Sequence, residues 1–127
     1  MEYVRYIQAL IEEQKSLGAV EGEVVSRYGH IPRLAPEAYN IYTFAPLTDE
    51  QLALLERVLN REVPKQYKIF LTLFSNGMHI FSRCLNLYGL QGVLDRRGDF
   101  QGPFDLSIPN VYERPSNADA SCFFFGS

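Results

Sequence analysis

The stretch REVPKQYKIFLTLFSNG, residues 61–77, constrains the fold of this chain more than any other. Pro64 suits the first turn of a helix, where the missing N–H of proline has no helical partner to lose. Large apolar side chains then recur at i, i+3, i+4 and i+7, as Tyr67, Phe70, Leu71 and Phe74. Asn76 and Gly77 tolerate the left-handed conformation that ends many helices. The stretch therefore predicts an amphipathic helix with one face buried in a core.

A second helix is predicted from Leu47 to Asn60. Thr48 lies three residues before Gln51, which is the spacing of a capping box. Acidic residues follow Thr48 directly, where the dipole of a helix favours negative charge. The apolar face of this helix consists of Leu52, Leu55 and Leu59, with Val58 beside them.

The first 46 residues are predicted to form a helix followed by a connecting arm. Residues 2–17 repeat apolar side chains at helical spacing, and Gly18 suits the position just after a helix. Prolines and glycines then interrupt residues 18–46, so no second long helix is expected there. Residues 38–45, AYNIYTFA, are aromatic and β-branched, and we expect them to lie extended on the body of the domain.

The pattern changes after Gly77, where short strands are expected. Residues 78–81 and 84–90 fit two strands joined by Ser82 and Arg83, and residues 91–103 are rich in turn formers. Residues 104–120 are mixed with an extended start, and residues 121–127, SCFFFGS, fit a buried strand. An exposed edge of three phenylalanines would invite aggregation. Either this strand is interior or the natural chain continues beyond Ser127, and we expect the second.

These elements predict a single α+β domain over residues 1–127, with a mixed or antiparallel sheet flanked by helices. A length of 127 residues fits one domain. The N-terminal helix and arm occupy residues 1–46, and the helix pair and sheet occupy residues 47–127. If the natural chain is longer, its continuation would complete the second part.

Composition and charge narrow the classes of function. The formal net charge is −3, which disfavours non-specific binding of nucleic acid, since that binding needs a basic surface. No apolar run approaches the roughly 18 residues of a membrane span. The N-terminus carries acids and bases rather than the apolar core of a secretory signal. We therefore expect a cytoplasmic protein that does not bind membranes.

The residues that most often carry catalysis form no recognisable pattern. Cys84 or Cys122 with His30 or His79 would make a thiol–imidazole pair or a metal site, but no two of the four have the spacing of a zinc motif. We expect two inert core thiols and no metal. A further carboxylate pair, Asp95 and Asp99, flanks two arginines and a glycine, which favours a solvated turn. The chain also lacks the glycine-rich phosphate, dinucleotide and hydrolase motifs. No catalytic residue is predicted.

Four residues of the arm are the predicted contacts to a protein partner. Glu21 and Glu23 would contribute to an acidic surface, and Tyr39 and Tyr42 would contribute aromatic contacts of the kind that dominate interfaces. The alternative for the tyrosines is burial in the core, because both lie in an apolar run. Solvation of a surface is the alternative for the glutamates.

The order of parts between Leu47 and Leu90 resembles the SUKH superfamily, also called the Smi–Knr group. A helix with Glu56 leads into Val63-Pro64, then Tyr67-Lys68, an apolar helix, Asn76-Gly77 and a strand that ends in LNLYG. Valine replaces the usual leucine before the proline. PFDL at residues 103–106, Asn110 and the CFFFGS segment fit the looser second half of the family pattern.

The resemblance implies an α+β fold and a binding protein without catalysis or cofactor. Many bacterial members of the superfamily resemble immunity proteins that bind and neutralise a toxin encoded beside them, and fungal members act as regulators through protein contacts. The leading hypothesis is thus an intracellular immunity protein that occludes a partner toxin. The alternatives are a regulatory or scaffold module without a toxin, and an enzyme with a site assembled from scattered residues such as His30, His79 and Asp95.

Overall fold

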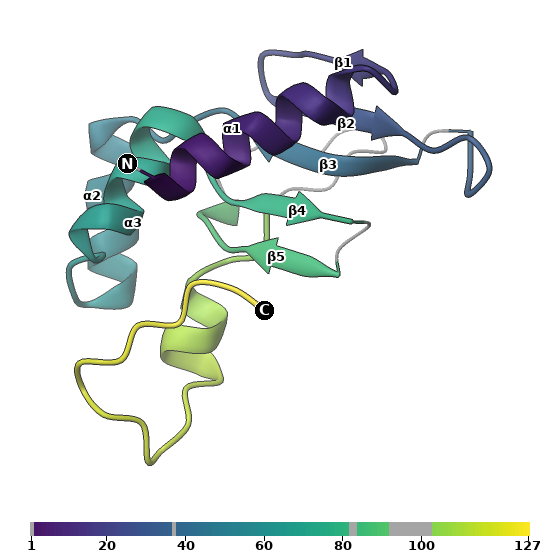
Figure 1. Ribbon diagram of the computed structural model, residues 1–127. Coiled ribbons are helices and arrows are strands. Elements are labelled where there is room, and N and C mark those ends of the chain that lie inside the picture. Colours follow the sequence, from purple (N-terminus) through teal and green to yellow (C-terminus); the bar gives the residue numbers. More distant parts are fainter. Residues whose placement is uncertain (1, 37, 82–83, 92–102) are drawn as a thin grey trace.

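The computed structural model describes residues 2–36, 38–81, 84–91 and 103–127, which form helices and one antiparallel sheet (Figure 1). In chain order the elements are α1 (Glu2–Lys15), β1 (Ala19–Val20), β2 (Val25–His30), β3 (Tyr39–Phe44), α2 (Asp49–Leu59), α3 (Lys65–Ile69), the π-helical turn η1 (Phe70–Phe74), β4 (Met78–Ile80), β5 (Leu85–Leu87) and the π-helical turn η3 (Ile108–Tyr112). The predicted α+β class with an antiparallel sheet is confirmed.

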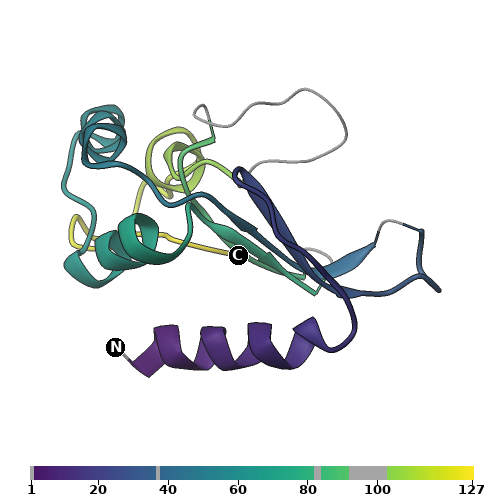
Figure 2. The same ribbon diagram turned by 90° about the horizontal axis from the view of Figure 1, so that it is seen from above.

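The strands of the sheet follow one another in chain order, from β1 to β5, and every neighbouring pair is antiparallel. Tyr28, Ile41 and Ile80 lie opposite one another on β2, β3 and β4, so they share one face. These side chains join Ile11 of α1 in the buried core. Helix α1 therefore covers this face of the sheet, and η3 lies on the other side (Figure 2).

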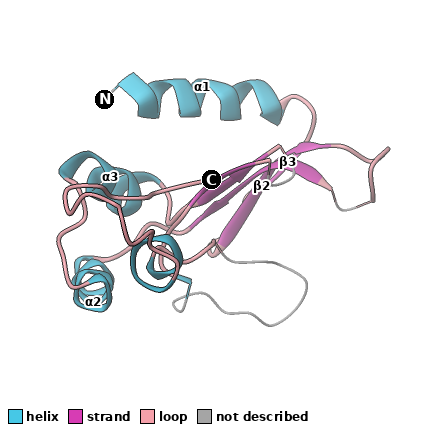
Figure 3. Ribbon diagram, turned by 90° about the horizontal axis from the view of Figure 1, so that it is seen from below, coloured by secondary structure: helices cyan, strands magenta, loops and turns pink. Residues whose placement is uncertain are grey.

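Helices α2 and α3 lie beside one end of the sheet (Figure 3), and their buried side chains belong to one core. The predicted apolar face of α2 is confirmed, because all three of its leucines are buried. Tyr67, Phe70 and Leu71 of the next helix are also buried, and Phe74 packs against the same core at its margin. The helix widens into a π-helical turn, in which the Ser75 N–H donates to the Phe70 carbonyl.

The end of this helix differs from the prediction at one of its two residues. Gly77 has a φ of 81°, as expected for a residue that follows a helix. Asn76 does not adopt a positive φ. Its side chain is instead buried, where it accepts from the Leu90 N–H at 2.7 Å and donates to the Leu90 carbonyl at 2.9 Å. Asn76 thus joins two segments of the chain rather than capping a helix.

The start of α2 is the capping box that the sequence predicts. Thr48 Oγ1 accepts from the Gln51 N–H at 3.2 Å, and the Gln51 side chain accepts from the Thr48 N–H at 2.9 Å. Replacing Thr48 by alanine removes the first bond, so we expect the free energy of unfolding to fall by about 1 kcal/mol. Urea denaturation measures this change. Thr48→Ser keeps the hydroxyl and should remain close to the wild type, and an equal loss in both variants would contradict the capping role.

The prediction that residues 18–46 form only a connecting arm is wrong. Residues 38–45 are extended, as expected, but residues 19–30 also contribute β1 and β2. The short apolar runs of this region are interrupted by glycines, and they become strands only because β3 supplies a neighbour on which they pair. Helix α1 ends two residues earlier than predicted, and Gly18 follows it with a φ of 120°.

The prediction of a buried C-terminal strand is also wrong. Residues 125–127 run along β5, where Asn86 and Ser127 exchange backbone hydrogen bonds of 2.8 and 2.9 Å. Phe125 is 51% exposed, so the segment lies at the edge of the sheet and not in its interior. The start of residues 104–120 is extended, with a bridge from Asp105 to Gly89, but the turn η3 that follows was not predicted. The predicted connection at 82–83 and most of the turn region at 91–103 lie outside the described residues.

Candidate functional site

The predicted partner contacts Glu21 and Glu23 lie in the turn between β1 and β2, and both are exposed. Glu21 Oε1 lies 3.4 Å from Lys15 Nζ, and the same lysine pairs with Glu12 at 2.8 Å. The hydroxyl of Tyr28 also lies 3.4 Å from Glu21 Oε1. Glu21 is thus partly neutralised by Lys15.

The predicted contacts Tyr39 and Tyr42 are half-buried on β3. Tyr39 stacks on His30, with ring centres 4.9 Å apart, and meets the edge of Tyr42 at 6.5 Å. His30 pairs with Tyr39 at one end of β2, whereas Glu23 precedes the other end. The length of β2 separates these ends by about 17 Å, at roughly 3.3 Å per residue. The structure therefore separates Tyr39 from the glutamates. Tyr42 pairs with Arg27 in the middle of β2 and lies between the two ends.

The prediction of buried cysteines is wrong, since Cys84 and Cys122 are free and exposed. Cys84 precedes β5 in a turn, and Cys122 lies in the C-terminal segment that runs along the surface. The apolar neighbours of the two cysteines predict interior strands, but both cysteines lie at the surface.

The two histidines have separate structural partners. His79 is buried, with Nδ1 2.8 Å from Asn86 Oδ1, and His30 Nε2 lies 2.8 Å from the Pro36 carbonyl oxygen. Among the described residues, no group of three or more histidine, cysteine and carboxylate side chains is placed to hold a metal ion. Asp95 and Asp99 lie outside those residues.

The residues that carry the family resemblance hold the fold together. Glu56 Oε2 accepts from the Val63 N–H at 2.8 Å and lies 3.4 Å from Lys68 Nζ. The hydroxyl of Tyr67 donates to the carbonyls of Tyr88 and Phe125. Burial, and to a smaller extent the neighbouring Tyr3, raises the pKa of Tyr67, so its phenol stays protonated and remains a donor.

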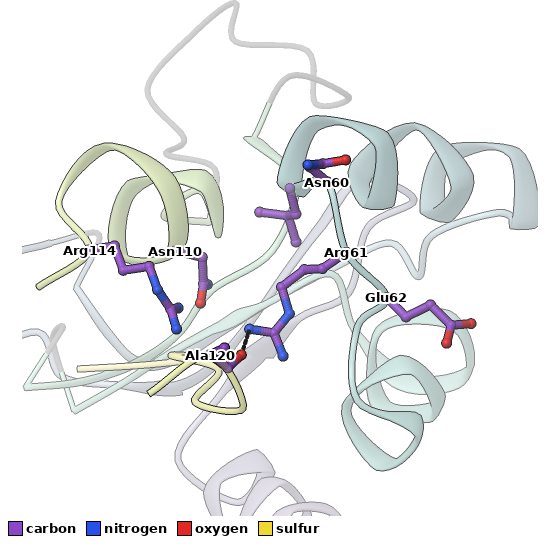
Figure 4. A pocket seen from close by; sticks show the side chains of 7 residues that line it. Asn60, Arg61, Glu62, Asn110, Arg114 and Ala120 are labelled. Carbon is purple, nitrogen blue, oxygen red and sulfur yellow. Dashed lines mark hydrogen bonds between the residues drawn. The ribbon is translucent and has the colours of Figure 1, made fainter. Parts of the chain in front are cut away.

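A polar pocket of about 530 Å³ opens between the end of α2, the turn η3 and the loop that follows it (Figure 4). The residues that line it are Leu59, Asn60, Arg61, Glu62, Asn110, Arg114 and Ala120. The guanidinium groups of Arg61 and Arg114 point toward each other across it, and the carboxylate of Glu62 points away. We call this the arginine pocket.

Both arginines of the pocket donate to carbonyls of the loop at residues 119–122. Arg61 Nη1 lies 2.8 Å from the Cys122 oxygen, and Arg114 Nη1 lies 3.1 Å from the same atom. Arg114 Nη2 also donates to the Asp119 carbonyl at 2.7 Å. Sequence reasoning missed this site, because no local pattern links two arginines that meet only in the folded chain.

A second hollow, of about 480 Å³, is apolar and lies between α1, α3, β5 and the C-terminal segment. Its lining residues are Tyr3, Ile7, Pro64, Gln66, Tyr67, Phe70, Leu87, Phe123 and Phe125. Tyr67 lies against three phenylalanine rings there, with centre distances of 5.3 to 6.2 Å. The hollow thus continues the aromatic core toward the surface.

Comparison of the chain with models of protein families, with curated proteins and with solved structures finds no match. No helix in residues 2–36, 38–81, 84–91 and 103–127 has the length and apolarity to cross a membrane. Any assignment of function therefore depends on the residues of this chain.

Proposed function

We propose that this chain is a non-catalytic binding domain of the SUKH type, and that it acts as an immunity protein that occludes a partner toxin. The observation that carries the proposal is the ordered set of motifs from Glu56 through Tyr67 and Asn76 to Gly89. Each of these residues is engaged in holding the fold, as the framework of a binding domain requires. Function would then lie on the surfaces that this framework presents.

The turn with Glu21 and Glu23 is one such surface, because both side chains are exposed. With a net charge of −3, the chain would attract a basic partner, and electrostatic steering would speed their encounter. An occluding interface of standard size buries about 1,600 Å² in total. An interface that also includes Tyr42 must reach the middle of β2, and one that includes Tyr39 must extend along the whole strand.

Capture from the native cells tests the proposal. The full chain is used as bait, and bound proteins are identified by mass spectrometry. We expect one stoichiometric toxin-like partner that is released only by denaturant or high salt. If the chain were recovered alone while a candidate toxin encoded beside it is expressed, the proposed immunity function would be contradicted. A stoichiometric partner without toxin activity would instead support the scaffold alternative.

The captured partner allows a charge-reversal test of the acidic turn. Glu23→Lys is expected to slow association about tenfold at low salt, with a smaller effect at high salt, since surface charges act mainly on the rate of encounter. Stopped-flow or surface-based kinetics measures the rate. Glu113→Lys makes the same charge change at another exposed position and is the matched control. Equal effects of the two variants would remove the turn from the interface.

A further inference from the structure

The two guanidinium groups of the arginine pocket are held close together. Because Arg61 Nη1 and Arg114 Nη1 share the Cys122 oxygen at 2.8 and 3.1 Å, the two nitrogens are at most about 6 Å apart. Like charges at this separation repel each other, even with partial screening by solvent. Their hydrogen-bond acceptors are neutral carbonyls, which carry no negative charge to offset either arginine.

No carboxylate of the described chain forms an ion pair with either arginine. Glu62 lines the pocket but pairs with Lys68 at 3.6 Å and points outward (Figure 4). Asp119 belongs to the loop that Arg114 holds. Its Oδ1 accepts from the N–H and hydroxyl of Ser121 at 2.8 and 2.7 Å, and these bonds, with a smaller contribution from Arg114, lower the pKa of Asp119.

The arginines also retain unused hydrogen-bond donors. A guanidinium carries five N–H donors, and the bonds to the loop engage only terminal nitrogens of Arg61 and Arg114. Each arginine also makes a cation–π contact. Arg61 Cζ lies 5.2 Å from the ring centre of Phe123, and Arg114 Cζ lies 5.5 Å from that of Phe124. Two guanidinium groups that are held in place and keep free N–H groups are suited to bind an oxyanion in bidentate fashion.

We propose that the arginine pocket binds a small molecule through a phosphate or carboxylate group, held jointly by Arg61 and Arg114. The volume of about 530 Å³ admits a ligand larger than the anionic group itself. The amide of Asn60 also lines the pocket and supplies both a donor and an acceptor for the remainder of the ligand. This site is separate from the acidic turn and does not depend on a protein partner.

Titration of the wild-type chain by nuclear magnetic resonance tests the site without altering the fold. Sodium phosphate and sodium succinate are added separately, with sodium chloride adjusted to constant ionic strength. We expect saturable shifts in the Nε–H signals of Arg61 and Arg114 and in the amides of residues 119–122, with half-saturation at about 1 mM or below. The anion that saturates at the lower concentration identifies the preferred group. Shifts that never saturate, or that are equally large at the exposed Arg33, would overturn the proposal.

Substitution of the arginines is the second test of the site. Arg61→Gln and Arg114→Gln are each expected to weaken anion binding at least tenfold, whereas Arg33→Gln should leave it unchanged. Because both arginines also hold the loop, Arg114→Lys serves as the milder variant. It keeps the charge but loses the fork, and we expect about fivefold weaker binding with an unchanged amide spectrum elsewhere. Wild-type affinity in all three pocket variants would overturn the proposal.

Discussion

Replacement of Phe70 by alanine is expected to lower the free energy of unfolding by about 3–5 kcal/mol, the usual cost of truncating a buried phenylalanine. Phe70 is 0% exposed. Its ring lies 5.5 Å from that of Tyr67 and 5.6 Å from that of Phe74, so its removal leaves a cavity between the two neighbours of the same stripe. Urea denaturation followed by circular dichroism measures the loss.

Leu73→Ala is the matched control for Phe70→Ala. Leu73 lies in the same π-helical turn but is 77% exposed, and its truncation should change stability by no more than about 0.5 kcal/mol. If both variants lost the same amount, the stripe would not be the buried face. If Phe70→Ala were stable but bound the partner more weakly, this helix would belong to the interface and not to the framework.

Asn76→Ala is expected to destabilise the fold by about 2–4 kcal/mol, because it leaves the N–H and carbonyl of Leu90 without their partner. Asn76 is 0% exposed, so water has no ready access to either group. Gly89 shares the contact, since a Cβ on it would lie 2.2 Å from Asn76 Oδ1. The Asn-Gly and Tyr-Gly pairs of the family resemblance are therefore two sides of one junction.

Thermal and chemical denaturation of Asn117→Ala provide the comparison for Asn76→Ala. Asn117 is exposed, and the same substitution there should fall within about 0.5 kcal/mol of the wild type. Hydrogen exchange at the Leu90 amide gives a local readout, which Asn76→Ala should accelerate strongly. Unchanged protection of that amide would show that another group satisfies it.

Helices α1, α2 and α3 were predictable because their signals are local. Short stretches of sequence contain all of these signals: the cap at Thr48, the proline at the start of α3, and the apolar spacing of α2 and α3. Strands β4 and β5 were found for the same reason, as two short apolar runs with a turn between them. Strands β1 and β2 were missed because their pairing depends on β3, which follows β2 only after two prolines.

The sites were less predictable than the fold, since they depend on which segments meet. Sequence reasoning placed Glu21 and Tyr39 on one arm, but antiparallel pairing of β2 with β3 sends them to opposite ends. Arg61 and Arg114 carry no motif, and they meet at the carbonyl of Cys122 once the chain has folded. The cysteines were misassigned because apolar neighbours accompany a surface segment as readily as a core strand.

The strand order of the sheet bears on how the chain would fold during synthesis. Since β1 to β5 pair in the order in which they are made, each strand finds its neighbour already present as it leaves the ribosome. Two long-range contacts form after the sheet. The Phe125 carbonyl accepts from the hydroxyl of Tyr67, and the Cys122 carbonyl accepts from Arg61. Until then Tyr67 lacks the cover of Phe123 and Phe125, and exposed aromatic surface of this kind favours self-association of the emerging chain.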